Sequence, residues 1–295
     1  MEQTTAKKNK YEIDMCNGTI MDKLISFSLP LMLSGILQLM FNAVDIIVVG
    51  RFSGSQALAA VGSTSALINV FTNLFIGISL GANVLTARFY AAGREKEVSE
   101  TVHTAITLAL VSGIIMALVG LVFSKGALAL MGTPDDVIGL SALYMRIYFL
   151  GMPFFMLYNY GAAILRAVGD TKRPLLFLMI AGVINACLNM VLVIVFKLGV
   201  AGVAIATVIS QMISCVLVLR CLCRSESSYR LRFSELGMKG YYLKQIFSVG
   251  VPAGIQSTVI NFSNVLLQSS VNSFGSTAMA GYTAANNLLG FCMSR

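Results

Sequence analysis

Long runs of apolar residues, separated by short polar segments, dominate the sequence. A helix needs about 20 such residues to cross a lipid bilayer, and none of the runs alternates apolar and polar positions as barrel strands do. The pattern therefore predicts an all-α polytopic membrane protein with seven complete spans and the start of an eighth. The predicted spans lie at roughly 24–50, 56–85, 100–131, 137–164, 174–196, 200–221, 244–272 and from 276 onward.

A short motif near the start of the chain returns near its end. The segment GSQALAA at 54–60 is echoed by GSTAMAG at 275–281, and Pro30 and Pro252 precede the two copies at nearly the same distance. A repeat after six spans is typical of transporters built from two related helical units. We therefore expect a six-helix N-terminal lobe and the first one or two helices of a pseudo-symmetric, incomplete second lobe, with twelve helices when complete.

Polar stretches divide this plan into four parts: a tail over 1–23, the first lobe over 24–221, a basic linker over 222–243 and the start of the second lobe over 244–295. With the N-terminus placed in the cytoplasm, sixteen Lys and Arg side chains fall in cytoplasmic segments and three in external loops. This asymmetry is the positive-inside signal. It predicts a multi-pass protein of the cell (inner) membrane whose tail and linker are cytoplasmic.

Composition excludes a soluble globular domain, because 57% of the residues are hydrophobic and 12% are charged, whereas about a quarter are charged in soluble proteins. The net charge of +8 is explained by its placement beside the spans, so nucleic acid is not an expected partner. The six cysteines and the single histidine, His103, lack the spacing of metal ligands. We expect His103 to be structural, and we expect no metal site other than one for Na⁺ at Asp45.

Asp45 is the one acidic residue that lies well inside a predicted span. A carboxylate there is costly to keep charged, so it should face a cavity or a partner, and it is a functional candidate by default. Gln38 lies seven residues earlier, which returns to nearly the same helical face, and Asn42 borders that face. The three residues form a polar stripe on an otherwise apolar helix, and Gln38 and Asn42 are candidates for a substrate cavity.

Other spans carry polar side chains as well. Asn185 and Asn189 share a face of the fifth span, and Thr207 lies in the sixth. Asn69 in the second span is a further cavity candidate, and Tyr144 in the fourth has a phenolic group suited to a cavity. Such residues often serve only as hydrogen bonds between membrane helices. Amide and hydroxyl oxygens beside a carboxylate also suit Na⁺, and the carboxylate alone suits a proton.

Two prolines and a glycine-rich run are expected to shape the helices. Pro30 and Pro252 each remove a backbone hydrogen bond inside a predicted helix, so we expect them to permit bends. The run IGISLGA at 76–82 is expected to let another helix approach closely.

Taken together, these landmarks resemble the MATE (multidrug and toxic compound extrusion) transporters over essentially the whole chain from residue 22. The resemblance implies two six-helix lobes, rocker-switch alternating access, and export of drugs or small organic cations in exchange for Na⁺ or H⁺. It implies a protein of the lipid bilayer that is not an enzyme, needs no cofactor and is monomeric when full length. The motifs that carry it are NAVDIIVVGRFSGSQALAAVG (42–62), GANVLTARFYAAGR (81–94), ILRAVGDTKRP (164–174) and NACLNMVLVIVFKLGVAGVAIATVISQ (185–211).

The resemblance also implies a site that couples transport to a cation or proton. Asp45 matches the family's first-helix aspartate, whose neighbours in the family fall here on Tyr144, Asn185, Asn189 and Thr207. The family's fifth helix often carries a second acid where this chain has Asn189. A Na⁺ ion would therefore meet one carboxylate and several neutral oxygens.

Three other interpretations stay open at this point. A flippase for lipid-linked sugars, from the same superfamily, would need a basic cavity for pyrophosphate, and Arg146 is the one basic residue inside a span. An intramembrane enzyme would need a nucleophile with a base, or a metal cluster, and the sequence offers neither. An inactive truncated fragment is the third, because a rocker-switch needs two lobes around one cavity.

Overall fold

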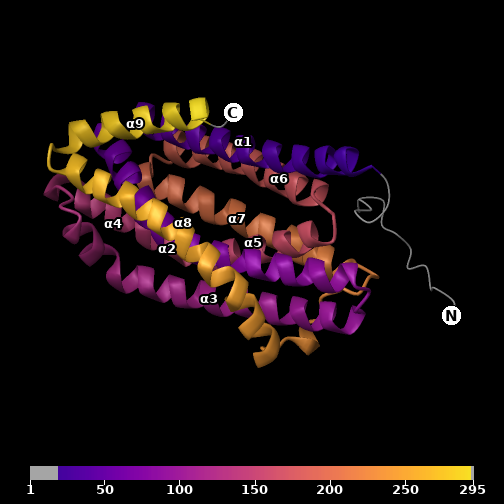
Figure 1. The fold of residues 1–295 in the computed structure, drawn as a ribbon. Helices are drawn as coiled ribbons and strands as arrows, with labels where there is room; N and C mark the ends of the chain where they lie inside the picture. The colour runs from indigo at the N-terminus through magenta and orange to yellow at the C-terminus, as the bar shows by residue number, and fades with distance from the viewer. Residues whose placement is uncertain (1–18, 294–295) are drawn as a thin grey trace, which may run out of the picture.

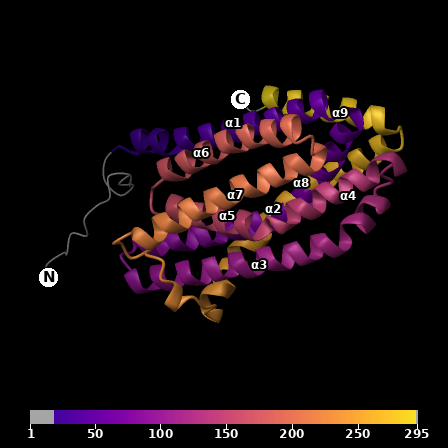
Figure 2. The same ribbon diagram turned by 180° about the vertical axis from the view of Figure 1, so that it is seen from behind.

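The computed structural model describes residues 19–293, with side chains described throughout except at position 20 and at 287–293. Within this range the chain forms nine α-helices, one π-helical segment and one 3₁₀ turn. The long helices lie side by side in one bundle, and most turns gather at its two ends (Figures 1 and 2). The elements are α1 (Ile20–Phe52), α2 (Ser55–Ala91), α3 (Glu95–Leu130), α4 (Asp135–Leu150), α5 (Met152–Ala167), α6 (Lys172–Asn189), η1 (Met190–Val195), α7 (Gly199–Arg224), η2 (Phe233–Glu235), α8 (Gly240–Asn272) and α9 (Ser276–Met293).

Each of the eight predicted spans is helical. Among the described residues, five helical segments are long and apolar enough to cross a membrane, namely α1, α2, α3, α6 with η1, and α7. Helices α4 and α5 make a sixth span when taken together, but they meet at a bend of 50°. The single helix predicted over 137–164 is therefore two helices. Gly151 separates them and Pro153 opens α5, because proline lacks the N–H that would continue the preceding helix.

Pro30 and Pro252 lie inside α1 and α8, each of which is assigned as one helix of 33 residues. Pro30 is buried and Pro252 is exposed. The Oγ of Ser34 donates a hydrogen bond to the carbonyl oxygen of Pro30 at 2.8 Å. A change of bend at these prolines stays a prediction, whereas the break at Gly151 is a feature that the sequence analysis missed.

The α1–α2 and α8–α9 hairpins share a local structure. Gly54 joins the first pair of helices and Gly275 joins the second, and both have φ of 89°. This left-handed region of backbone space favours glycine, which explains the glycine in both copies of the repeated motif. The equal lengths of α1 and α8 extend the likeness, and both observations agree with the predicted repeat.

Helix α8 packs along α2 through four glycines, which we call the glycine seam: Gly77, Gly81, Gly250 and Gly254. A Cβ added at Gly77 would lie 2.2 Å from the Cα of Gly254, and one at Gly81 would lie 2.2 Å from the carbonyl oxygen of Ile246. The two backbones are therefore in direct contact, as small residues four apart allow in membrane helices. The close approach predicted for IGISLGA is present, and its partner is the segment VGVPAG at 249–254.

The helices that carry the polar candidates lie next to one another. Helix α1 packs against α6, α6 packs against α7, and α4 contacts α7. The α-helical pattern of α6 ends at Asn189, where the π-helical segment η1 begins. Segments of π-helix are rare and often occur at functional sites. This part of the bundle is therefore the first place to look for chemistry.

Candidate functional site

Asp45 is linked to α6 and α7 by a chain of hydrogen bonds. The Nδ2 of Asn189 donates to the Oδ1 of Asp45 and, at 3.2 Å, to the Oδ1 of Asn185. The Nδ2 of Asn185 then donates to the Oγ1 of Thr207 at 3.5 Å. We call these four residues the Asp45 network. The structure thus brings together four of the five residues predicted for ion coupling, drawn from three helices.

The network is buried and leaves one polar atom unsatisfied. Asn185 and Asn189 are 5% and 0% exposed, and Asp45 is partly buried. The Oδ1 of Asn189 is buried and has no hydrogen-bond donor. An orphaned buried acceptor costs about 1–3 kcal/mol, so its presence in a native structure calls for an explanation. An ordered water would satisfy this oxygen where it stands, and a cation beside Asp45 would satisfy it once the Asn189 amide had turned.

Tyr144 lies on α4, close to the network. It is 7% exposed and stacks on Tyr148, with ring centroids 6.1 Å apart and the planes 27° from parallel. Both phenols lie within electrostatic range of the Asp45 carboxyl. The fifth predicted coupling residue therefore borders the network without a direct hydrogen bond to it among the contacts described.

Tyr148 and Gln211 extend the site beyond the residues that the sequence analysis named. The Tyr148 side chain is hydrogen-bonded to Gln211, and the Oε1 of Gln211 is a second buried oxygen without a donor. Gln211 lies one turn beyond Thr207 on α7, and Tyr148 lies one turn beyond Tyr144 on α4. Spacing of four residues places each pair on one helical face, and this was the signal available in the sequence.

The three cavity candidates lie outside the Asp45 network. The side chains of Gln38 and Asn42 are exposed on α1, and that of Asn69 is exposed on α2. The backbone carbonyl of Asn69 accepts hydrogen bonds from Thr72 and Asn73 within the same helix. Their role in holding a substrate stays a prediction.

The chemistry of the network suits a small cation or a proton. Among the residues described, no group of three or more His, Cys, Asp and Glu side chains is placed to hold a metal ion. The network offers one carboxylate, two amide oxygens and one hydroxyl, which are hard oxygen ligands of the kind that bind Na⁺. The carboxylate is also the one group in the network that can take up a proton.

A family model described as MatE matches residues 30–191, which is more than half of the chain. The chain belongs to the MatE family. Because the match includes most of α1 and all of α2 to α6, it covers Asp45, Tyr144, Asn185 and Asn189. With its long apolar helices, this MatE chain is a multi-pass membrane protein.

Several known proteins resemble the MatE chain over most of its length. The probable multidrug resistance protein YoeA of Bacillus subtilis is 36% identical over 274 residues, which is 90% of this chain and 59% of that protein. The multidrug export protein MepA of Staphylococcus aureus is 24% identical over 272 residues, 91% of this chain and 59% of that protein. The solved structure of the MATE multidrug transporter DinF-BH in complex with rhodamine 6G has a TM-score of 0.86 and 25% identity, and covers 96% of this chain and 63% of that chain. The chain thus spans about three fifths of the length of these relatives.

Proposed function

We propose that this chain forms the ion-coupling part of a secondary active antiporter that exports drugs or small organic cations in exchange for Na⁺ or H⁺. The observation that carries the proposal is the Asp45 network, in which a carboxylate inside a membrane helix accepts a hydrogen bond from the Asn189 amide of a neighbouring helix, while the oxygen of that same amide is buried without a donor. The names of the relatives, a multidrug resistance protein and a multidrug export protein, support drugs as the exported class.

In this proposal, Asp45 takes up the cation or proton from outside the cell. Before it binds, the amide group of Asn189 stabilises the charged carboxylate by a charge-assisted hydrogen bond. A bound cation would instead be held by the carboxylate and by the Oδ1 of Asn189. The amide would then have to turn, because its NH₂ and its oxygen cannot both face Asp45. Binding would thereby rearrange the contact between α1 and α6.

This rearrangement is the proposed link between the ion and the drug. A bound ion shifts a transporter only by the difference in its affinity for the two conformations. The network joins α1, α6 and α7, so its state affects how these helices pack. We propose that the ion-bound state favours the inward-facing conformation of a rocker-switch, in a protein of the cell (inner) membrane with a cytoplasmic N-terminus that acts as a monomer when full length.

The test uses the full-length protein in proteoliposomes, with the dye rhodamine 6G as the probe and an imposed Na⁺ gradient at matched pH, or a pH gradient at matched Na⁺. We expect one of the two gradients to drive the dye against its own gradient, and an ionophore that dissipates that gradient to stop the movement. The gradient that works identifies the coupling ion. If neither gradient changes the movement of the dye, exchange of the dye for Na⁺ or H⁺ is ruled out.

Gln211 provides a second, independent prediction about the same region. Replacing Gln211 by Met is expected to slow ion-driven efflux of rhodamine 6G by roughly tenfold, equivalent to about 1.4 kcal/mol, because the Tyr148 hydroxyl loses its partner beside the network. The melting temperature should change little, because the loss of an orphaned buried acceptor offsets the cost of leaving the Tyr148 hydroxyl without its partner. Gln56→Met, an identical change at an exposed position at the start of α2, is the matched control. Unchanged efflux in Gln211→Met would exclude Gln211 from the site.

A further inference from the structure

The segment between α7 and α8 is docked on the bundle rather than suspended between two lobes. We call residues 225–239 the strap. Tyr229 of the strap is fully buried and meets Tyr90 of α2 edge to face, with ring centroids 6.5 Å apart. Leu231 is 2% exposed, and its N–H donates to the carbonyl oxygen of Leu222 at 3.1 Å. The basic linker predicted over 222–243 is therefore structured over most of its length.

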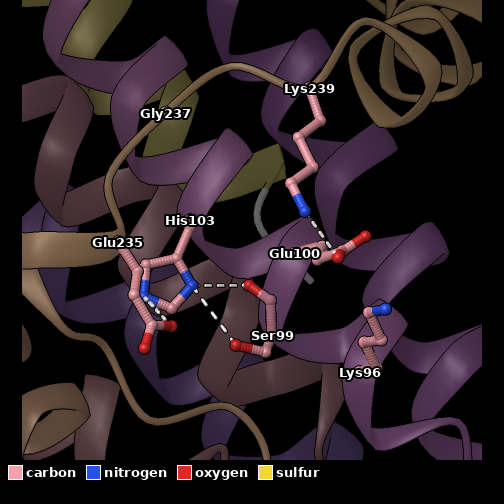
Figure 3. A pocket seen from close by; sticks show the side chains of 7 residues that line it. All are labelled: Lys96, Ser99, Glu100, His103, Glu235, Gly237 and Lys239. Carbon is pink, nitrogen blue, oxygen red and sulfur yellow. Dashed lines mark hydrogen bonds and ion pairs between the residues drawn. The ribbon is translucent and has the colours of Figure 1, made fainter.

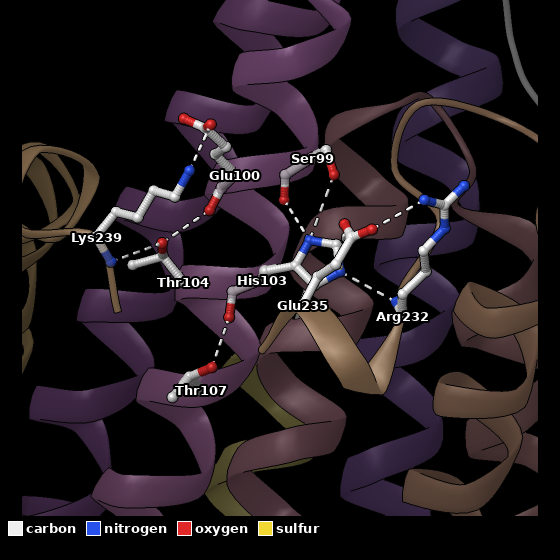
Figure 4. A network of polar contacts seen from close by, with 8 residues as sticks. All are labelled: Ser99, Glu100, His103, Thr104, Thr107, Arg232, Glu235 and Lys239. Atoms are coloured by element: carbon white, nitrogen blue, oxygen red, sulfur yellow. Dashed lines mark hydrogen bonds and ion pairs between the residues drawn. The ribbon is translucent and has the colours of Figure 1, made fainter. Parts of the chain in front are cut away.

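His103 of α3 holds the next part of the strap through one ring nitrogen, while its other ring nitrogen is bonded within α3. Its Nδ1 lies 2.6 Å from the carbonyl oxygen of Ser99, and its Nε2 accepts a hydrogen bond from the backbone N–H of Arg232 at 3.0 Å (Figure 4). A carbonyl can only accept and a backbone N–H can only donate. The ring must therefore carry its proton on Nδ1 and a lone pair on Nε2, which means that this arrangement requires neutral histidine.

The far end of the strap is fixed to the same helix. The backbone N–H of Lys239 donates to the Oγ1 of Thr104 at 3.4 Å, and its ammonium group pairs with Glu100 at 2.5 Å. Because α8 begins at the very next residue, the position of the strap also sets where α8 starts. The latched strap thus joins the beginning of α8 to the beginning of α3.

His103 is 4% exposed, but it lines a pocket of about 360 Å³ between α3 and the strap (Figure 3). Two ammonium groups and two carboxylates share the walls with the imidazole. This pocket gives protons from the predicted cytoplasmic side a route to the ring. The lining residues are Lys96, Ser99, Glu100, His103, Glu235, Gly237 and Lys239.

We propose that His103 is a proton-sensitive latch, which holds the strap backbone at Arg232 against α3 while it is neutral and frees the Arg232 N–H when it is protonated. Histidine is the side chain whose charge commonly changes between about pH 5 and 8. Protonation would place an N–H at Nε2, opposite the N–H of Arg232, so that two donors would face each other and one hydrogen bond would be lost. The Oε2 of Glu235, 3.9 Å from Nε2, would attract the charged ring, so that protonation exchanges a contact with the strap backbone for one with a strap side chain.

The charged and titratable groups that face His103 come from three elements and carry both signs. The groups concerned are Glu235, Arg232 and Lys239 on the strap, Lys96 and Glu100 on α3, and Tyr242 on α8, which hydrogen-bonds Glu100.

Glu235 itself does not supply a competing transition in this pH range. A hydrogen bond from Arg232 lowers the pKa of Glu235 below its ordinary value, and the charges of Arg232 and Lys239 act in the same direction. A lowered carboxyl pKa gives stability that is present above the ordinary value and lost as the pH falls through the lowered one. Between about pH 7.5 and 5.5 Glu235 therefore stays charged.

For transport, the latch would matter most if protons enter the cell during drug export. Acidification beside the strap would then change the contact between α3 and the strap and, through it, the rate of exchange. This consequence rests on the proposed function, whereas the latch itself rests only on the contacts of His103.

The test measures hydrogen exchange at the strap in the full-length protein, without substrate or ion gradient, at about pH 7.5 and about pH 5.5, with intrinsic exchange rates corrected for pH. We expect protection of the peptide containing Arg232 to fall by about fivefold or more at the lower pH, as the loss of one hydrogen bond predicts. The loop containing Asp170, whose N–H donates to Leu165, is an internal control that should not respond.

His103→Gln is the decisive variant, because glutamine keeps a hydrogen-bond acceptor but does not titrate. In this variant, the peptide containing Arg232 should have the same protection from hydrogen exchange at both pH values, whether that protection is high or low. A fall in this variant as large as in the wild type, or no fall in the wild type, would overturn the latch. Because no transport is measured, failure of the antiport proposal leaves this result unaffected.

Discussion

Replacing Asp45 by Asn is expected to abolish ion-driven efflux of rhodamine 6G, with a loss of about a hundredfold or more, equivalent to about 2.7 kcal/mol. Asparagine has nearly the same shape, so the contact with α6 can be retained by reorienting the amides. It cannot take up a proton, and it offers a cation no charge. The bound and unbound states would then differ little in energy, and a gradient could not drive the change of conformation.

The measurement is dye movement in proteoliposomes under the gradient that drives the wild type, with thermal unfolding followed in parallel. We expect the melting temperature of Asp45→Asn to be maintained, because neutralising a buried carboxylate removes a desolvation cost. Asp135→Asn, the same chemical change at an exposed residue of the first turn of α4, should transport normally. If Asp45→Asn is folded and still couples efflux to the gradient, Asp45 is not the coupling group.

The largest effect on stability is expected at the glycine seam. In Gly77→Ala the new Cβ would lie 2.2 Å from the Cα and 2.3 Å from the N of Gly254. Backbone atoms cannot turn aside as a side chain can, so α8 must move away from α2. Overpacking in a tight interior typically costs about 1–3 kcal/mol of stability and occasionally more. We expect Gly77→Ala to fall at the upper end of this range and to lower the melting temperature clearly.

Gly126→Ala on α3 is the matched control, because a Cβ there meets nothing within 4 Å. Alanine is favoured over glycine in a helix interior by roughly 0.5–1 kcal/mol, so this variant should be as stable as the wild type or more stable. A wild-type melting temperature for Gly77→Ala would show that α2 and α8 do not touch at this depth in the folded protein.

The features that the sequence predicts well are those that depend on local periodicity. Apolar runs indicate the helices because a bilayer-spanning helix needs length and hydrophobicity, and both are properties of one segment. The shared face of Asn185 and Asn189 follows from their spacing. That Asp45 meets this face does not follow from any spacing, because Asp45 and Asn189 are 144 residues apart. The resemblance to the MATE transporters supplied that association, and the hydrogen bonds give it geometry.

The features that the sequence analysis missed depend on contacts between distant segments. Gly250 and Gly254 look like ordinary glycines near a proline until α2 lies against them. In the sequence the strap looks like a basic linker, because it has more charged residues than residues that are buried against the bundle, such as Tyr229 and Leu231. The role of His103 depends on a backbone N–H 129 residues away. Every residue type except proline has such an N–H, so the sequence does not indicate which one His103 meets.

The π-helical segment after Asn189 has a consequence for how this part of the membrane domain tolerates change. A π-helical turn holds one more residue than an α-helical turn, and one residue corresponds to about 100° of rotation around the axis. Deleting a single residue from 190–195 would let η1 wind as α-helix. It would leave every side chain of the Asp45 network in the protein, while the faces of α6 and α7 would be turned relative to each other. The winding of one short segment thus sets how Thr207 on α7 is aligned with Asn185 and Asn189 on α6, so that the loss of one apolar residue is expected to disturb the site while its carboxylate is still present.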